Sequence, residues 1–367
     1  MTVAKGTSSA AAEEPKGVEQ QRRLDIAVVI VTYKSAQLAI EALRSVHRER
    51  SATEIGIRAI VIDNSGQDLA AIAAAAATHG WDSWVTLVKA PRNGGFAYGN
   101  NLGIAHACAA KRPDYIYLLN PDAQVRDGGL VALVRFLESH PRVGIAGSRI
   151  ENLDGSDWSI AFRFPSLISE LTHGLDVGVV ERLLRRWTVA RPMSRDAQPV
   201  DWISGSSMMI RSSVFTAIGG MDENYFLYFE ETDFCRRAKQ AGFSTWYVPE
   251  SRVMHIGGQS TQVTDLRTGP KRLPSYWFDS RRRYFAVTFG VTRTMFIDIV
   301  ALSAHVVGLL KRALLGRKHQ SVPYYFRDLA RGSVLWRRNR QVAAPACRLQ
   351  IERLPVASPR SSTMGVP

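Results

Sequence analysis

The chain has 367 residues and a formal net charge of +14 at pH 7. Its composition, 46% hydrophobic and 22% charged, is that of a globular protein and excludes wholesale disorder, a collagen-like repeat and a polytopic membrane protein. This length suits one large α/β domain with an appendage, because single cores stop growing near ~250 to 300 residues.

The positive charge is confined to the C-terminal part of the chain. Residues 267–367 carry 19 Lys and Arg against four acidic residues, whereas residues 1–266 have a net charge of −1. A nucleic-acid-binding core needs basic side chains on the face that meets the phosphates. The neutral body therefore argues against nucleic acid as a partner.

Four segments are predicted. Residues 1–24 lack a continuous apolar run, so we expect a disordered leader of a cytoplasmic protein and no signal peptide. Residues 25–272 form the α/β domain, 273–340 a basic helical appendage and 341–367 a disordered tail. The cysteines are far apart and odd in number, which predicts free thiols in a reducing compartment: Cys108, Cys235 and Cys347.

From Asp25 onward, short apolar runs alternate with helical patterns, as in β-α-β units on a mostly parallel sheet. The predicted strands are Ile26–Val31, Ala59–Ile62, Val85–Val88, Tyr115–Leu119, Val143–Gly147, Thr245–Val248 and Val253–His255. The predicted helices are Leu38–Val46, Leu69–Thr78, Tyr98–Ala110, Leu130–Leu137, Tyr276–Phe289, Met295–Leu315 and Tyr324–Trp336. Residues 150–200 have no clean period and are expected to cover a site.

One long apolar stretch, Met295–Leu310, contains Asp298 and is shorter than the ~20 residues that span a bilayer. It is flanked by Arg293 and by Lys311-Arg312. Two interpretations stay open: a helix that lies in a membrane interface, and a helix that packs on the body.

Polar or small residues follow each of the first four predicted strands: Thr32-Tyr33-Lys34, Asp63-Asn64-Ser65, Asn93-Gly94-Gly95 and Asn120-Pro121-Asp122. The carboxyl ends of parallel strands meet at one edge of a sheet, so these residues predict a ligand site there, although each motif alone also fits a turn. The glycines do not fit the Gly-x-Gly-x-x-Gly pattern, which disfavours a nicotinamide-dependent dehydrogenase.

Two acidic features carry the expected chemistry. Asp122 follows a buried strand, where it suits a divalent metal beside a diphosphate, with a helix N-cap as the alternative. The second feature places Glu230, Glu231 and Asp233 beside an aromatic run. At helical spacing, Glu230 and Asp233 share a face and Glu231 points elsewhere. A carboxylate in such a partly dry setting suits a general base.

Together these residues resemble the family 2 inverting glycosyltransferases, and particularly the rhamnosyltransferase-like branch that builds bacterial cell-surface polysaccharides. The resemblance runs from Ile26 to Thr261 and rests on motifs in the family's order: Val31-Thr32-Tyr33, Asp63-Asn64-Ser65, Asn93 to Asn101, Asn120-Pro121-Asp122, Trp202 to Ser206, Gly219 to Glu223, Phe229 to Asp233, and His255 with Ser260. It implies a GT-A type fold, which is a Rossmann-like, mostly parallel sheet with flanking helices.

The resemblance also implies site residues. Nucleotide-binding positions are Thr32, Tyr33, Asp63, Asn93, Gly94, Gly95, Asn101 and Asn120. Trp202, Ser204 and Gly205 line the sugar and acceptor pocket, and Asp122 with His255 binds Mg²⁺ or Mn²⁺. Glu231 aligns with the general base, Glu230 is the alternative base, and Asp233 positions its neighbours or an arginine. The family's Asp-x-Asp is Asn120-Pro121-Asp122 here, one carboxylate fewer.

The implied reaction moves a sugar, L-rhamnose from dTDP-L-rhamnose, to a lipid-linked saccharide. Alternatives are a UDP-hexose or another donor, and a noncatalytic scaffold that binds anionic polymer through the tail; a nucleotidyltransferase is disfavoured because only Lys34 follows the first strand. We expect a cytoplasmic protein, peripheral on the inner face of the membrane. The residues expected to contact an anionic leaflet are Arg281-Arg282-Arg283, Lys311-Arg312, Arg317-Lys318 and Arg337-Arg338.

Overall fold

The structure is a computed structural model that describes residues 23–175, 184–256, 270–315 and 322–336. The predicted leader, apart from its last two residues, and the predicted tail lie outside these ranges, as do Ser260, Cys347 and the basic pairs at 317–318 and 337–338. The other two cysteines, Cys108 and Cys235, are free and buried.

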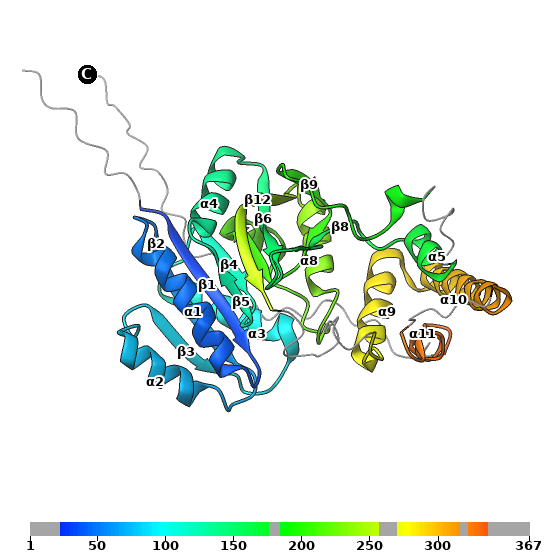
Figure 1. Ribbon diagram of the computed structural model, residues 1–367, viewed down its shortest axis with the longest axis horizontal. Coiled ribbons are helices and arrows are strands. Elements are labelled where there is room, and N and C mark those ends of the chain that lie inside the picture. Colours follow the sequence, from blue (N-terminus) through cyan, green and yellow to red (C-terminus); the bar gives the residue numbers. More distant parts are fainter. Residues whose placement is uncertain (1–22, 176–183, 257–269, 316–321, 337–367) are drawn as a thin grey trace, which may run out of the picture.

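A ten-stranded sheet forms the body (Figure 1). Its strands are β1 (Asp25–Thr32), β2 (Gly56–Asp63), β3 (Val85–Lys89), β4 (Tyr115–Leu119), β5 (Ala123–Val125), β6 (Val143–Glu151), β7 (Asp157–Trp158), β9 (Gln198–Val200), β11 (Ser207–Arg211) and β12 (Ser244–His255). The order is β3-β2-β1-β4-β11-β6-β12-β5, with β7 on β6 and β9 on β12. Strands β8 (Ala161–Phe162) and β10 (Trp202–Ile203) form a separate antiparallel pair.

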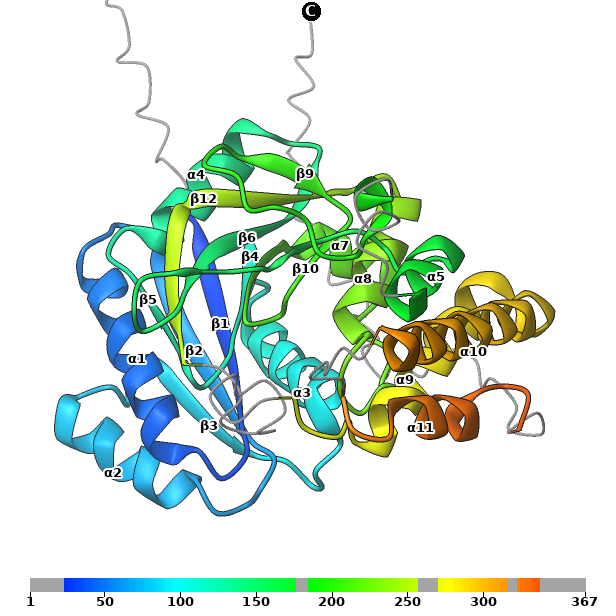
Figure 2. The ribbon, with the colours of Figure 1, turned by 45° about the vertical axis from the view of Figure 1, so that its right-hand side comes forward.

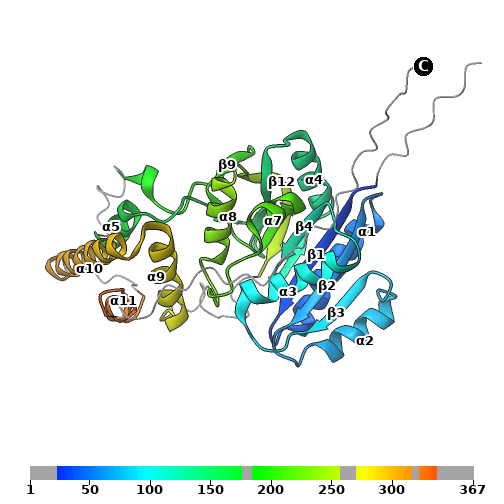
Figure 3. The same cartoon turned by 180° about the vertical axis from the view of Figure 1, so that it is seen from behind.

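The first four strands are parallel, with β1 between β2 and β4. Helices cover both faces: α1 (Ala36–Ser51), α2 (Leu69–His79), α3 (Gly95–Ala110), α4 (Gly129–Ser139), α7 (Ser212–Ile218) and α8 (Glu230–Gln240). Helices α1 and α4 lie on the face seen in Figure 1, and α3 and α7 on the face seen from behind in Figure 3. Every residue from Ile26 to Ile30 is fully buried, because this central strand is covered on both faces. The predicted α/β sheet with flanking helices is confirmed.

A second, smaller body is made by α5 (Leu167–Leu175), α9 (Ser275–Phe289), α10 (Val291–Leu314) and α11 (Tyr325–Gly332). Figure 2 shows α10 beside α5 and α11. Helix α5 comes from the irregular segment at 150–200, yet it packs mainly on α10. This smaller body thus combines three helices of the predicted appendage with α5, a helix from inside the predicted α/β domain. We call α5, α9, α10 and α11 together the appendage.

A buried ion triplet joins the appendage helices. Arg281 on α9 is 1% exposed and donates to Asp298 Oδ1 of α10 at 2.7 Å and to Glu170 Oε2 of α5 at 2.6 Å. The other oxygen of Asp298 accepts from the backbone N–H of Val334 at 2.9 Å. Since each charge is paired inside the protein, the triplet fixes these elements to one another.

The Arg281-Arg282-Arg283 run is therefore not a membrane-facing cluster. Arg282 pairs with Asp279 at 2.8 Å, and Arg283 donates to Asp222 of the body at 2.8 Å. All three side chains are less than one-sixth exposed. The prediction that this run contacts an anionic leaflet is wrong, because its charges are used to assemble the appendage and dock it on the body.

Helix α10 has two different faces. One face is buried against α5 and α9: Thr294, Ile297, Asp298, Ala301, Ala304 and Gly308. The opposite face is apolar and exposed: Phe296, Ile299, Val306, Val307, Leu310 and Leu314. By length and composition, α10 is the one described helix that would be able to cross a membrane. Its buried face shows that it packs on the other helices of the appendage.

Candidate active site

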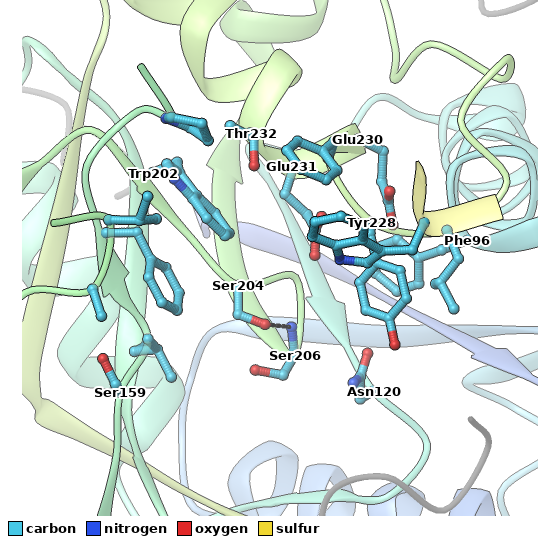
Figure 4. Close-up of a pocket in the computed structure, with 18 of the residues that line it drawn as sticks. Phe96, Asn120, Ser159, Trp202, Ser204, Ser206, Tyr228, Glu230, Glu231 and Thr232 are labelled. Atoms are coloured by element: carbon cyan, nitrogen blue, oxygen red, sulfur yellow. Dashed lines mark hydrogen bonds between the residues drawn. The ribbon is translucent and has the colours of Figure 1, made fainter. Parts of the chain in front are cut away.

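A cavity of 1360 Å³ opens where the parallel strands end (Figure 4). Figure 4 shows Trp202 and Ser159 on one side, Phe96 and Asn120 on the other, and Glu231 between them. Nine of the predicted site residues line this cavity: Tyr33, Asn93, Asn120, Asp122, Trp202, Ser204, Glu230, Glu231 and His255. The structure therefore brings the strand-end motifs and the acidic segment to one place.

The two glutamates enter the cavity at the N-terminus of α8, after an unusual turn. Tyr228 and Phe229 have φ angles of 71° and 67°, the left-handed region that residues other than glycine seldom adopt. The turn is held from the appendage, where Ser280 Oγ donates to Leu227 O at 3.0 Å. Such conformations cost free energy and persist where the surroundings over-determine them, which is typical of functional sites.

The same turn is held from the body by the start of α3. The backbone N–H of Phe96 donates to Phe226 O at 2.9 Å. Gly95 has a φ of +85°, and a Cβ there would lie 1.8 Å from Phe226 O. Glycine at position 95 is therefore required so that the α3 N-terminus can approach the 226–229 turn.

Glu231 has a fixed orientation, whereas Glu230 has an unsatisfied oxygen. Glu231 Oε1 accepts from the backbone N–H of Gly205 at 3.1 Å. Glu230 is 1% exposed, and its Oε2 has no hydrogen-bond partner in the described part of the chain. Burial raises the pKa of both carboxyls, and the charge of Glu231 raises the pKa of Glu230 further. The pair therefore holds one negative charge more readily than two.

Asp233 lies apart from this pair. Its two oxygens accept from Arg236 at 2.8 Å and from Arg237 at 2.7 Å, and it does not line the cavity. Glu230 and Asp233 are three positions apart on α8, but Glu230 lines the cavity together with Glu231, and Asp233 does not. Asp233 has the positioning role expected for it, and the geometry does not place it among the catalytic acids.

The second polar feature is the pair of Asp122 and His255. His255 Nε2 is 3.1 Å from Asp122 Oδ1 and 3.4 Å from Asn120 Nδ2. Helix α4 begins after Gly128, so Asp122 is not an N-cap. No cluster of three or more His, Cys, Asp or Glu that suits a metal occurs among the described residues. Two protein ligands nonetheless fit Mg²⁺ or Mn²⁺, which complete their shells with water and phosphate oxygens.

The charge of the cavity favours a bound cation. Among the described residues, the lining includes no Lys or Arg but has four acidic side chains: Asp122, Glu170, Glu230 and Glu231. A diphosphate in such a pocket is repelled unless a cation accompanies it. Asp122 and His255 are the lining residues able to hold that cation.

Several predicted nucleotide-binding residues have internal roles instead. Asp63 accepts hydrogen bonds from Ser65, Gly66, Asp68 and Leu69 of its own loop, so both its oxygens are occupied. Burial alone would raise the pKa of Asp63, but these hydrogen bonds lower it. Its predicted contact with the base is therefore not supported by the geometry, and the turn interpretation fits.

Thr32 and Asn101 are also buried outside the cavity lining. Thr32 Oγ1 donates to Asp68 Oδ2 at 2.6 Å. Asn101 Nδ2 donates to Met221 O at 2.8 Å, and Asn101 Oδ1 accepts from Met221 N at 2.9 Å. Gly94 and Gly95 shape the α3 N-terminus, and Gly205 acts through its backbone on Glu231. These residues build the site without facing its interior.

The sequence analysis expected residues 150–200, which include α5, to cover a site, but it named no site residue in the wall that the appendage contributes. This wall comprises Ser169, Glu170, Thr172 and His173 of α5, Tyr276 and Trp277 of α9, and Tyr325 of α11. The aromatic residues near 276 were a visible signal, but their position beside the site depends on how α9 folds back. Trp158 of β7 was also missed, and its ring lies 5.4 Å from that of His255.

Solved structures resemble this fold. A mannosyltransferase from Pyrobaculum calidifontis, in complex with GDP-Man and Mn²⁺, has a TM-score of 0.51 at 17% identity, covering 86% of this chain and 81% of that one. GalNAc-T7 with UDP, GalNAc and Mn²⁺ has a TM-score of 0.52 at 16% identity, covering 85% and 57%. At these identities the likeness shows the GT-A type fold alone.

Curated relatives match part of the chain. The N-acetylglucosaminyl-diphospho-decaprenol L-rhamnosyltransferase of Mycobacterium tuberculosis is 36% identical over 151 residues, 40% of this chain and 48% of that protein. Rhamnosyltransferase WbbL of Escherichia coli is 30% identical over 166 residues, 44% of this chain and 60% of that protein. The chain thus spans about half to three-fifths of the length of these relatives.

A sequence model of the family described as glycosyltransferase-like family 2 matches residues 23–269. This match includes the sheet, both cavity glutamates and the pair of Asp122 and His255. The chain therefore belongs to glycosyltransferase-like family 2.

Proposed function

We propose that this protein is an inverting, metal-dependent glycosyltransferase that moves L-rhamnose from dTDP-L-rhamnose to a lipid-linked saccharide. One observation carries the proposal: an oriented carboxylate, Glu231, faces the same cavity as the metal-compatible pair of Asp122 and His255. A base for the acceptor and a cation site for the leaving diphosphate are the two groups that a single displacement needs.

Glu231 accepts the proton of an acceptor hydroxyl. The oxygen of that hydroxyl forms a bond to the anomeric carbon as the bond from this carbon to the phosphate oxygen breaks, and the nucleoside diphosphate leaves with the electron pair. Attack opposite the leaving group inverts the anomeric configuration. The N–H of Gly205 holds Glu231 in place, and the apolar rings of Phe96 and Phe229 limit water around it.

Asp122 and His255 would hold Mg²⁺ or Mn²⁺, and the cation when bound neutralises charge on the departing diphosphate. Asn120 Nδ2 lies 3.4 Å from His255 Nε2 on the same side of the cavity. The aromatic face of Trp158 packs beside the same ring. These neighbours fix His255 so that Nε2 faces Asp122.

The names of the relatives support the proposed substrates. Both curated relatives are named as rhamnosyltransferases, and one name contains a diphospho-decaprenol acceptor. The two solved structures were determined with a nucleotide or nucleotide sugar and Mn²⁺. A donor with a deoxysugar and an acceptor with a prenyl diphosphate are therefore the first substrates to test.

A donor panel tests the proposal. Purified protein is incubated with dTDP-L-rhamnose, UDP-glucose, UDP-N-acetylglucosamine or GDP-mannose, with Mn²⁺ or with EDTA. We expect dTDP-L-rhamnose with Mn²⁺ to give the largest thermal stabilisation and slow donor hydrolysis. Preference for a UDP-hexose would show that dTDP-L-rhamnose is not the donor. No response to any nucleotide would favour the noncatalytic scaffold.

We also propose that the protein binds the membrane surface through the exposed face of α10. Six apolar side chains on this face repeat at helical spacing and face solvent: Phe296, Ile299, Val306, Val307, Leu310 and Leu314. Such a stripe on a soluble protein indicates a binding surface. Arg293 at one end and Lys311 and Arg312 at the other supply positive charge for an anionic leaflet.

Deletion of residues 292–367 would not test the exposed face of α10 alone, because it also removes Asp298, a buried partner of Arg281. Val307→Ser with Leu310→Ser changes only exposed side chains. We expect the double variant to lose flotation with vesicles of phosphatidylglycerol and phosphatidylethanolamine while its unfolding temperature is unchanged. Flotation equal to that of the wild type would contradict a membrane role for this face.

A further inference from the structure

The cavity is larger than one ligand needs. Its volume of 1360 Å³ exceeds the ~300 to 1,000 Å³ usual for a ligand site. Tyr33, Asn93, Asp122 and His255 line it from the strand ends. The appendage wall lines the same cavity, and Figure 1 places α9 and α11 beyond α8 from β1. We call the part of the cavity lined by the strand-end residues its first compartment and the part lined by the appendage wall its second compartment; both glutamates line this cavity.

The second compartment has a continuous aromatic lining. Phe229 packs on Trp277 with ring centroids 5.7 Å apart, Trp277 on Tyr325 at 6.0 Å, and Tyr325 on His173 at 5.5 Å. Tyr276 extends this lining toward Phe226 at 5.3 Å. We call the space bounded by Phe229, His173, Tyr276, Trp277 and Tyr325 the aromatic chamber.

The polar groups of the chamber suit hydroxyl groups better than phosphates. Ser169, Glu170 and Thr172 of α5 line it, and within the described ranges no Lys or Arg does. Glu170 is ion-paired with Arg281, which does not line the chamber, so a phosphate there would have no cation facing it. A neutral sugar ring avoids this repulsion, because its C–H faces pack on aromatic rings while its hydroxyls find polar partners.

The chamber is built as a rigid wall. The triplet of Glu170, Arg281 and Asp298 joins α5, α9 and α10, and Arg283 docks α9 on Asp222 of the body. Ser280 of α9 also holds the turn that presents Glu230 and Glu231. The aromatic chamber and the proposed base are therefore positioned by the same helix.

We infer that the aromatic chamber is the acceptor subsite and that it binds the neutral terminal sugar of the lipid-linked acceptor. The acceptor's diphosphate then lies outside the chamber. This inference rests on the proposed function, since it assigns the acceptor half of the same cavity. It adds α5, α9 and α11 as the elements that determine which acceptor is used.

Direct binding tests this assignment. The probe is N-acetylglucosamine joined through diphosphate to a short prenyl chain, and the comparison probe is the same prenyl diphosphate without sugar. In saturation-transfer NMR, we expect the wild type to transfer saturation to the sugar protons. We expect Trp277→Ala and His173→Ala each to raise the Kd of the glycosylated probe about tenfold. Their Kd values for dTDP with Mn²⁺ and for the sugar-free probe should not change.

Trp336→Ala is the matched control, because Trp336 is on the same body but 76% exposed and outside the cavity. His173 is itself exposed at the cavity mouth, so its variant should fold even if Trp277→Ala does not. Unchanged sugar binding in both variants, or a wild type that shows no saturation transfer to the sugar, would overturn the inference. A wild type that binds the glycosylated probe but no nucleotide would instead sink the proposed donor half and leave the chamber assignment standing.

Discussion

The backbone N–H of Gly205 donates to Glu231 Oε1 at 3.1 Å. Gly205 lies between β10 and β11, whereas Glu231 is in the first turn of α8, so this hydrogen bond joins two separate motifs of the chain. A Cβ at position 205 would lie 2.7 Å from the ring of Phe96 and 3.2 Å from Glu231 Cγ. Glycine therefore permits the approach that orients the proposed base.

The buried pair of Glu230 and Glu231 predicts an unusual dependence of stability on pH. The pKa of Glu230 is raised by burial and by the charge of Glu231, so the folded state binds a proton that the unfolded state releases. Stability is then full below the unfolded pKa, near 4.5, and falls as the pH rises through the folded pKa. Glu230→Gln should raise the unfolding temperature at pH 8 and flatten its decline from pH 5 to 8.

Thermal unfolding across this pH range checks the expectation. Glu250→Gln is the control, since Glu250 is exposed and its substitution should leave the profile unchanged. A Glu230→Gln variant less stable than the wild type at pH 8 would mean that the buried carboxylate is compensated by a partner.

Removal of the proposed metal should weaken nucleotide binding. In Asp122→Asn, the stabilisation by dTDP with Mn²⁺ should fall to the level that the wild type shows in EDTA, because no lining cation replaces the lost site. Asp127→Asn serves as the control, since the Asp127 side chain is 89% exposed. Equal Mn²⁺-dependent shifts in Asp122→Asn and the wild type would exclude Asp122 as a ligand.

A methyl group at Gly95 should displace the turn that carries the glutamates. Gly95→Ala places its Cβ against Phe226 O, and we expect a loss of about 1–3 kcal/mol of stability together with reduced turnover. Gly80 also has a positive φ, +67°, but has open space around a Cβ. Gly80→Ala should cost about 1–2 kcal/mol from backbone strain and keep full turnover. If both variants lose turnover alike, the contact with Phe226 is not the cause.

The ion triplet of the appendage should be a major contributor to its stability. Arg281→Ala leaves Asp298 and Glu170 without their cation, which is expected to cost about 3–5 kcal/mol in urea unfolding. Arg293→Ala, at an exposed position on the same body, should change stability by less than about 0.5 kcal/mol. A cost below about 1 kcal/mol for Arg281→Ala would indicate that water or another group compensates the buried acids.

Much of the body was predictable from the sequence. Apolar runs such as Tyr115–Leu119 are strands because both of their faces are covered, and alternation with helices makes them parallel. The ends of parallel strands meet at one edge, so Asn93, Asn120 and Asp122 were expected to share a site, and they line one cavity.

The remainder depends on contacts that sequence patterns do not contain. Asp63 and Thr32 follow strands as ligand residues do, but the loop between β2 and α2 uses their oxygens internally. The run of three arginines has the composition of a surface patch, yet Arg281 is buried because Glu170, 111 positions away, folds beside it. The aromatic chamber arises from the same long-range contact.

The role of Glu231 is tested most directly by transfer of radiolabelled rhamnose from dTDP-L-rhamnose to the glycosylated prenyl diphosphate probe with Mn²⁺. Glu231→Gln retains the shape of the side chain and removes its basicity. We predict that its kcat falls by a factor on the order of 10²–10⁴ while the Kd for dTDP with Mn²⁺ is unchanged, and that Glu250→Gln transfers like the wild type. Transfer by Glu231→Gln at the wild-type rate would contradict its assignment as the base.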